Sequence, residues 1–210
     1  MEQEKVRLKG VAHTLLGSLS ARAVGGDLRA LEACAFLKTH DNTMGNFSFE
    51  PAIDRTAIYD AAVLNYISAH PRSRILNIGC GFCTRFERVD NGQIHWTDFD
   101  QAEVVALRRQ FFGPDSPRRR LVSGNLRDKA PLPTHDLLVA EGVLVYLPES
   151  RAMEIVQGHC LFDVFTMERT VRLGSTQLWR YDPSNWNLNV LNSWHYDSPS
   201  RQAMVLEVHQ

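Results

Sequence analysis

The stretch that decides the fold is RILNIGCGFCTRFERVDNGQIHWTDFD, residues 74–100. Its apolar start predicts a strand over residues 74–79, followed by a glycine turn and a helix. A second apolar run predicts a strand over residues 94–98 that ends in the carboxylate of Asp98. Strand, glycine turn, helix and strand together form a βαβ unit. Glycine in such a turn lets the backbone approach a ligand closely, although many strand-to-helix turns use glycine without binding anything.

The chain after residue 100 repeats this alternation of short apolar runs and helices, which is typical of a parallel sheet. Further strands are predicted near residues 120–123, 135–141, 161–168, 189–196 and 203–209, and helices near 101–112 and 149–159. The sequence therefore predicts an α/β fold with a Rossmann-like, seven-stranded, mostly parallel sheet.

The chain ahead of this sheet has helical periodicity. Apolar residues recur at helical spacing from Val6 to Leu19 and from Leu28 to Leu37, and a third helix is expected from Pro51 to about His70. We expect residues 1–72 to form an N-terminal helical cap and residues 73–210 to form the core. A chain of 210 residues suits one domain, so the cap is expected to belong to the same domain as the core.

Composition and charge argue against several classes of protein, among them nucleic-acid-binding, membrane-spanning and disulfide-rich proteins. The chain is 44% hydrophobic and 22% charged, which is ordinary for a globular protein, and its formal net charge of -1 gives no bulk attraction to nucleic acid or anionic membranes. It shows neither a signal-peptide pattern nor a membrane span. The four cysteines are scattered, so a disulfide scaffold is not expected. These features predict a cytoplasmic protein with no nucleic-acid or membrane partner. They leave the oligomeric state open.

Polar residues follow several predicted strands. Asp98 stands where a βαβ unit places an acid for ribose hydroxyls, although a helix cap or a solvated turn acid is the alternative. Asn125 and Leu126 follow the third strand, and Glu141 ends the fourth. Because parallel strand ends meet in one crevice, we expect these residues to converge on a nucleotide-type ligand.

Longer motifs carry a more specific signal. They are Thr14-Leu15-Leu16, Arg22-Ala23, Arg55-Thr56 with Asp60, Ile78-Gly79-Cys80-Gly81-Phe82-Cys83-Thr84-Arg85, Trp96-Thr97-Asp98-Phe99-Asp100 and Glu141-Gly142-Val143-Leu144-Val145-Tyr146-Leu147. Through these motifs the chain resembles the leucine carboxyl methyltransferase and tetracenomycin-type polyketide O-methyltransferase family. The resemblance spans roughly residues 6–170. It implies the class I methyltransferase fold and S-adenosyl-L-methionine (SAM) as the cofactor.

The resemblance also implies roles for individual residues. Gly79, Cys80 and Gly81 would pack against the methionyl part of SAM. Asp98, with Phe99 beside it, would hold the ribose, and Asn125 and Leu126 would frame the adenine. Arg55 would pair with the methionyl carboxylate, and Glu141 would line the side of the methionyl amino group. A guanidinium matches a carboxylate well, although Arg55 could also be a surface residue of an amphipathic helix. The chain departs from the family at Cys83 and Asn125, where aspartate is usual or common, and this leaves the acceptor open.

The implied reaction is O-methylation of a small molecule, a carboxylate or a phenol, in secondary metabolism. Tyr146 is the first candidate for a catalytic base, ahead of Tyr196 and His195. Two alternatives stay open. The protein could be a cyclase that converts the aminobutyrate moiety of SAM to azetidine-2-carboxylate and releases methylthioadenosine, or a non-catalytic SAM-binding module.

Two further patterns have simple structural explanations. Cys80-Gly-Phe-Cys83 is formally a C-x-x-C motif, but no second pair completes a zinc site, so no metal is expected. The aromatic residues between Trp179 and Tyr196 are expected to pack on the sheet, with an aromatic wall around a sulfonium as the alternative.

Overall fold

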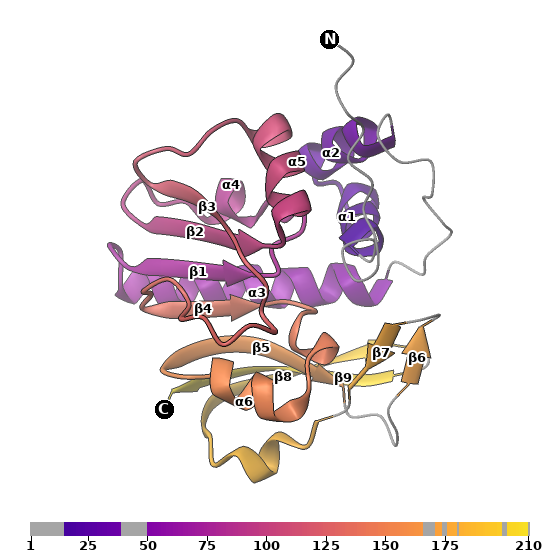
Figure 1. Ribbon diagram of the computed structural model, residues 1–210, viewed down its shortest axis with the longest axis vertical. Helices are drawn as coiled ribbons and strands as arrows, with labels where there is room; N and C mark the ends of the chain where they lie inside the picture. The colour runs from indigo at the N-terminus through magenta and orange to yellow at the C-terminus, as the bar shows by residue number, and fades with distance from the viewer. Residues whose placement is uncertain are drawn as a thin grey trace.

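A seven-stranded sheet forms the centre of the computed structural model, in the order β3-β2-β1-β4-β5-β9-β8 (Figure 1). The structure describes residues 15–38, 50–165, 171–173, 176–179, 181–198 and 201–209. The strands of the sheet are β1 (Arg74–Ile78), β2 (His95–Asp100), β3 (Arg119–Ser123), β4 (Leu137–Ala140), β5 (His159–Phe165), β8 (Asn189–Ser198) and β9 (Arg201–His209). Strands β1 to β5 pair in parallel, whereas β9 is antiparallel to β5 and β8. The predicted Rossmann-like, mostly parallel sheet is confirmed.

Helices cover the sheet and one of its ends. They are α1 (Leu15–Val24), α2 (Leu28–Lys38), α3 (Glu50–Ala69), α4 (Arg85–Val89), α5 (Ala102–Phe112) and α6 (Glu149–Ile155), with short 3₁₀ turns η2 (Leu144–Tyr146) and η3 (Pro183–Trp186). Figure 1 shows α3 running along the sheet, and α1 and α2 beyond the carboxyl ends of β1 and β2. The predicted helical residues 6–14, including Thr14, lie outside the described residues. In the described ranges, no helix combines the length and apolar character needed to cross a membrane.

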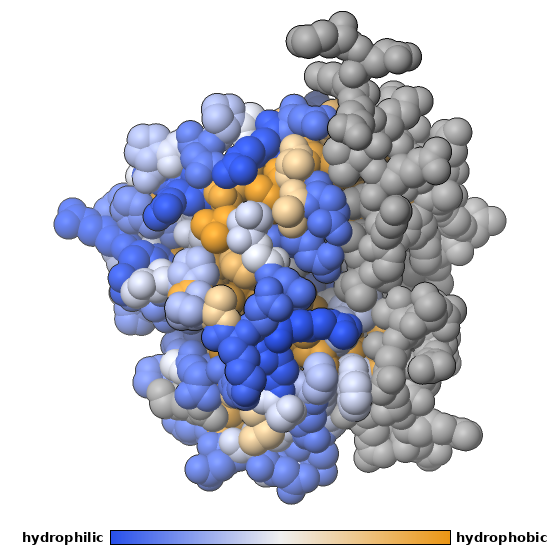
Figure 2. Space-filling model, viewed as in Figure 1, coloured by the Kyte–Doolittle hydropathy of each residue, from blue (hydrophilic) through white to orange (hydrophobic). Residues whose placement is uncertain are grey.

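Apolar cores lie on the two faces of the sheet, which is why its central strands are continuously hydrophobic. All four residues of β4 are buried. On one face Tyr59 and Val63 of α3 pack against the sheet. On the other face Ala152 of α6 and Trp186 of η3 pack, and the Trp186 ring stacks on Phe162 at 5.9 Å between centroids. On the face shown in Figure 2, the coloured residues are mostly hydrophilic, and apolar residues form an irregular patch around the centre.

A third apolar cluster joins the N-terminal helices to the rest of the chain. Leu16 and Leu19 of α1 and Leu37 of α2 pack with Phe82, from the turn after β1, and with Val104 of α5. This packing fixes which side of α1 faces the ends of the parallel strands.

Element ends differ from the predictions in several places. Strand β2 continues to Asp100, beyond the predicted end at residue 98, and helix α6 ends at Ile155 rather than 159. The chain then turns at Gly158, whose φ is +72°, and enters β5. The two-stranded sheet of β6 (Val171–Leu173) and β7 (Thr176–Leu178) was not predicted. Strands this short give almost no periodic signal. Residues 166–168 of the predicted fifth strand lie outside the described ranges.

Candidate functional site

The parallel strands lead to a cavity of about 270 Å³. Its wall comes from the turns after β1 to β4 and from one face of α1. The strand order reverses between β1 and β4, which is where open α/β sheets bind ligands. All predicted site residues line this cavity except Asp98; those that do are Arg55, Gly79, Cys80, Gly81, Phe99, Asn125, Leu126, Glu141 and Tyr146.

The turn after β1 brings backbone to the cavity. Gly79 and Gly81 have φ angles of +55° and +46°, which residues with a side chain rarely adopt. A Cβ on Gly79 would lie 2.5 Å from Cγ2 of Val143, so the turn is also too closely packed for a larger residue. The N–H of Gly81 donates to Oδ2 of Asp100 at 2.7 Å. This hydrogen bond ties the glycine turn to the end of β2.

The carboxylate that β2 brings to the cavity belongs to Asp100, not to the predicted Asp98. Asp98 is 1% exposed, and its Oδ2 accepts hydrogen bonds from Arg108 at 2.6 Å and from Arg119 at 3.1 Å. Burial raises the pKa of Asp98, but the two guanidinium groups outweigh it and hold the pKa below its usual value. Asp98 therefore joins α5 and β3 to β2 beneath the cavity. The physical reason for the correction is the longer strand, because only its last residue reaches the edge.

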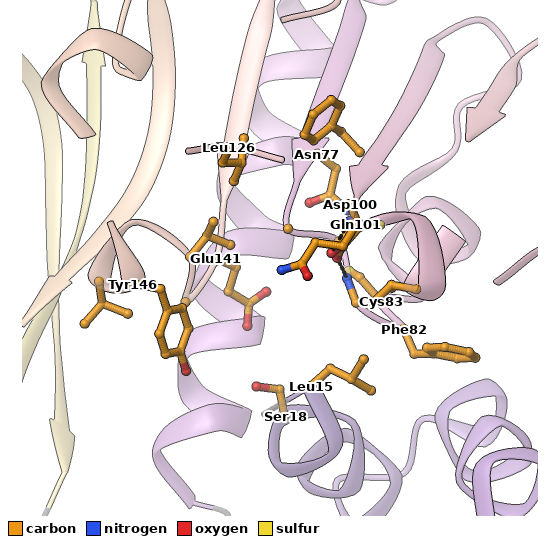
Figure 3. A pocket seen from close by; sticks show the side chains of 18 of the residues that line it. Leu15, Ser18, Asn77, Phe82, Cys83, Asp100, Gln101, Leu126, Glu141 and Tyr146 are labelled. Carbon is orange, nitrogen blue, oxygen red and sulfur yellow. Dashed lines mark hydrogen bonds between the residues drawn. The ribbon is translucent and has the colours of Figure 1, made fainter. Parts of the chain in front are cut away.

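Asp100 is held in place by backbone donors. Its two oxygens accept from the N–H groups of Gly81 and Gln101, each at 2.7 Å, and Figure 3 shows Asp100 and Gln101 together on the cavity wall. Burial raises the pKa of this carboxyl above its ordinary value, while the two backbone bonds oppose the shift. A carboxylate oxygen has a second lone pair, so Asp100 keeps acceptor capacity for hydroxyl groups.

The loop after β3 forms the wall next to Asp100. The ring of Phe99 packs against Gly124, where an added Cβ would lie 2.4 Å from its Cζ. Asn125 and Leu126 follow directly and line the cavity. Oδ1 of Asn125 accepts from the N–H of Arg127 at 3.0 Å, and Arg151 Nε donates to the carbonyl of Leu126 at 2.7 Å. The loop thus presents the apolar side chain of Leu126 and the amide of Asn125 to the cavity.

A buried charge cluster lies at the end of β4. Glu141 Oε1 accepts from Nε of Arg55 and from the hydroxyl of Thr56, both at 3.1 Å, and its Oε2 accepts from Nη2 of Arg85 at 2.6 Å. Burial raises the pKa of Glu141, but Arg85 and Arg55 outweigh it and hold the pKa well below its usual range. Arg55 also pairs with Asp163, at 3.4 Å. Glu141 is therefore ionised and largely engaged, and the charge of Arg55 is balanced by two carboxylates.

Arg22 of α1 is the cationic group that sequence reasoning missed. It lines the cavity, is 7% exposed, and donates from Nη2 to the carbonyl of Phe82 at 2.8 Å. Its Nε is buried without a hydrogen-bond partner, and no carboxylate of the described residues forms an ion pair with it. The Arg22-Ala23 motif was the available signal, but it does not say which way the side chain points.

Tyr146 stands at the opposite wall, where its side chain projects into the cavity across from Ser18 of α1 (Figure 3). The other two candidate bases do not reach this space. Tyr196 is buried, with its hydroxyl donating to Asp163 Oδ2 at 3.2 Å, and His195 is exposed on β8. Of the three candidates, the structure brings only Tyr146 to the cavity.

The late aromatic residues pack rather than surround a ligand. Tyr181 and Trp186 belong to the core on one face of the sheet, Trp194 and Tyr196 to the core on the other, and none of them lines the cavity. Cys80 and Cys83 do line it, as free thiols. Within the part of the chain that the structure describes, no group of three or more histidine, cysteine or acidic residues could hold a metal ion.

Comparison with known proteins gives two curated relatives. The chain is 27% identical over 172 residues to the tetracenomycin polyketide synthesis O-methyltransferase TcmP of Streptomyces glaucescens, covering 73% of this chain. It is 24% identical over 188 residues to the S-adenosyl-L-methionine-dependent methyltransferase dpfgK of Gibberella zeae, covering 75% of this chain. The match spans 63% of the length of each relative. No protein-family model matches the chain.

Solved structures show the same fold. The magnesium protoporphyrin IX methyltransferase of Synechocystis PCC 6803, crystallised with bound SAM, superposes with a TM-score of 0.55 at 9% identity, covering 97% of this chain and 99% of that one. These comparisons agree with the predicted SAM-dependent methyltransferase. By fold the chain is similar to the class I SAM-dependent methyltransferases, and by sequence it resembles the tetracenomycin-type O-methyltransferase among its relatives.

Proposed function

We propose that this protein transfers the methyl group of SAM to a carboxylate oxygen of a small molecule. The observation that carries the proposal is a single cavity with two chemically different ends. One end has the glycine turn, Asp100 and the apolar loop at Leu126, and the other has the hydroxyl groups of Tyr146 and Ser18. The first end suits a nucleoside, and the second suits an anionic partner.

The residues of the first end fit SAM. The orphaned Nε of Arg22 is a buried donor directed at no protein group, as a site for the methionyl carboxylate requires. We assign that carboxylate to Arg22, with Arg55 as a second donor. Asp100 would accept the ribose hydroxyls in place of Asp98, and Asn125 and Leu126 would frame the adenine. Glu141 would face the amino group, for which its charge is suitable.

SAM would supply an electrophilic methyl group on a sulfonium, so the protein's task is to position and desolvate an oxygen nucleophile. A carboxylate meets a cationic sulfonium in this reaction, and both charges disappear in the product. A cavity shielded from water favours such a neutralisation more than bulk water does, because it solvates the separated charges poorly.

The second end favours a carboxylate over a phenol. A carboxyl group has a pKa near 4 and needs no base at neutral pH, whereas a phenol with a pKa near 10 must lose its proton. Glu141 is engaged by three donors and is a poor proton acceptor. We therefore propose that Tyr146 orients the acceptor as a hydrogen-bond donor rather than acting as the catalytic base.

The name of TcmP places that relative in polyketide synthesis. We extend this to the chain as a proposal: the acceptor is a small carboxylate of secondary metabolism, bound between Tyr146 and the cap.

The test is product analysis by mass spectrometry, with methyl-labelled SAM and a panel of aromatic carboxylic acids and matched phenols. We expect labelled methyl esters from the acids, in amounts equal to the S-adenosyl-L-homocysteine (SAH) formed, and little product from the phenols. Methylthioadenosine formed from SAM alone would instead indicate cyclisation. Tight SAM binding with no product from any acceptor would indicate a binding module.

A further inference from the structure

One face of α1 meets the cavity, and it carries Leu15, Ser18 and Arg22. Helical spacing places these residues on the same side of the helix. Their neighbours Leu16 and Leu19 are 1% and 0% exposed and pack into the core shared with α2 and α5. Core packing therefore fixes the rotation of α1, and with it the place of Ser18 at the cavity wall.

The Ser18 hydroxyl accepts one hydrogen bond, and its own O–H has no acceptor among the described residues. Nη2 of Arg55 donates to Ser18 Oγ at 3.3 Å, and no acceptor for the Ser18 hydroxyl is found among the described residues. A hydroxyl carries one donor and two acceptor lone pairs, so the contact with Arg55 directs its O–H away from the guanidinium. Figure 3 shows the Ser18 oxygen turned toward the side of the cavity where the Tyr146 hydroxyl lies.

The donor to Ser18 is itself held firmly. Arg55 pairs with Glu141 at 3.1 Å and with Asp163 at 3.4 Å, and these carboxylate side chains are 8% and 1% exposed. Moving the guanidinium would break two buried ion pairs, which is costly. A hydroxyl that accepts a hydrogen bond from a cation is also a stronger donor, because hydrogen bonds in a chain polarise one another. Ser18 is thus a fixed and polarised neutral donor.

We infer that Ser18 is a specificity-determining residue that donates its O–H to the carboxylate of the acceptor, at the oxygen that is not methylated. The inference rests on the proposed function, because it takes a carboxylate as the acceptor. In the transfer, the other oxygen forms a bond to the methyl carbon while the carbon–sulfur bond breaks and its electron pair stays on sulfur. No proton moves, so Ser18 keeps its hydrogen bond throughout and acts through the binding of the acceptor.

The test uses 2-naphthoate as the probe and protein saturated with SAH. Calorimetry measures the affinity for 2-naphthoate, and separate titrations measure the affinity for SAH. For Ser18→Ala we expect binding of 2-naphthoate to weaken about 10- to 100-fold, the range of one hydrogen bond to a charged group, with SAH affinity changed by less than about twofold. Ser18→Thr, which keeps the hydroxyl, should restore most of the affinity. Ser20→Ala is the matched control, because Ser20 is buried in the same helix and does not line the cavity.

In turnover with SAM, loss of the Ser18 hydroxyl in Ser18→Ala should raise KM for 2-naphthoate and leave kcat nearly unchanged. A loss of SAH affinity in Ser18→Ala would place Ser18 on the cofactor and overturn the inference. Equal binding of 2-naphthoate by the wild type and Ser18→Ala, or no binding by the SAH-loaded wild type, would overturn it as well. Failure of the proposed function has a different signature: the wild type binds SAH and 2-naphthoate but forms no methyl ester from SAM.

Discussion

The two aspartates of β2 should respond in opposite ways to the same substitution. Asp100 faces the cavity, and each charged hydrogen bond it would make to a ribose hydroxyl contributes about 1.5–3 kcal/mol. Asp100→Asn removes at least one of these, so SAH should bind roughly 10- to 100-fold more weakly. Only one atom of the new amide can accept a hydrogen bond, so its NH2 group would face one of the two backbone N–H groups that now donate to Asp100. That mismatch should cost about 1 kcal/mol and lower Tm by about 2–4 °C.

Asp98→Asn should have the opposite effect, with a large loss of stability and little change in SAH binding. It removes the charge that faces Arg108 at 2.6 Å in a fully buried pair, and breaking such a pair costs about 3–5 kcal/mol. For a chain of this size that corresponds to a fall in Tm of about 6–20 °C. The folded variant should bind SAH within about threefold of the wild type, since Asp98 does not touch the cavity. Calorimetry with SAH below the lower Tm, together with thermal unfolding, measures both quantities. Loss of SAH binding in Asp98→Asn with full binding in Asp100→Asn would refute this assignment.

Three further changes test other parts of the site. Arg22→Ala should weaken SAH binding about 10- to 100-fold, while methylthioadenosine, which has no methionyl carboxylate, should bind as before; equal losses for both ligands in calorimetry would contradict the assignment. Gly124→Ala should cost about 1–3 kcal/mol in urea unfolding, because the new Cβ meets the ring of Phe99, and unchanged stability would show that the ring moves freely. The pKa of Glu141 is lowered on folding, so its stabilising contribution is present above the unfolded pKa and is lost as pH falls below about 4. Urea unfolding from pH 6 to 3 should therefore show a shallower acid loss in Glu141→Gln, and parallel pH profiles would argue against this role.

The sheet was predictable because its signals are local. Short apolar runs, a glycine turn and helical periodicity each depend on neighbouring residues. The order of the strands across the sheet depends on pairings between distant segments and was not predicted. The division into a cap over residues 1–72 and a core over 73–210 stays a prediction. Within the described part of that cap, α1 shares a core with Phe82 and Val104.

The site was predictable only in part, because its details depend on tertiary contacts. Asp98 and Asp100 lie on the same side of β2, so alternation cannot choose between them; the choice depends on where the strand ends, which its pairing with β3 decides. Arg22 and Ser18 enter the cavity only because leucines on the adjacent side of α1 pack into the core. No local pattern specifies that rotation of the helix.

The place of β9 has a consequence for the synthesis of the protein. The strand lies between β5 and β8, although both precede it in the chain. Until Arg201–His209 leaves the ribosome, one edge of β5 stays unpaired and exposes its backbone N–H and C=O groups. Chains grow at about 5–20 residues per second, so this edge waits for seconds. An unpaired apolar edge is a template for aggregation. We therefore expect the yield of soluble protein to depend more on chaperones during translation than the stability of the finished fold would suggest.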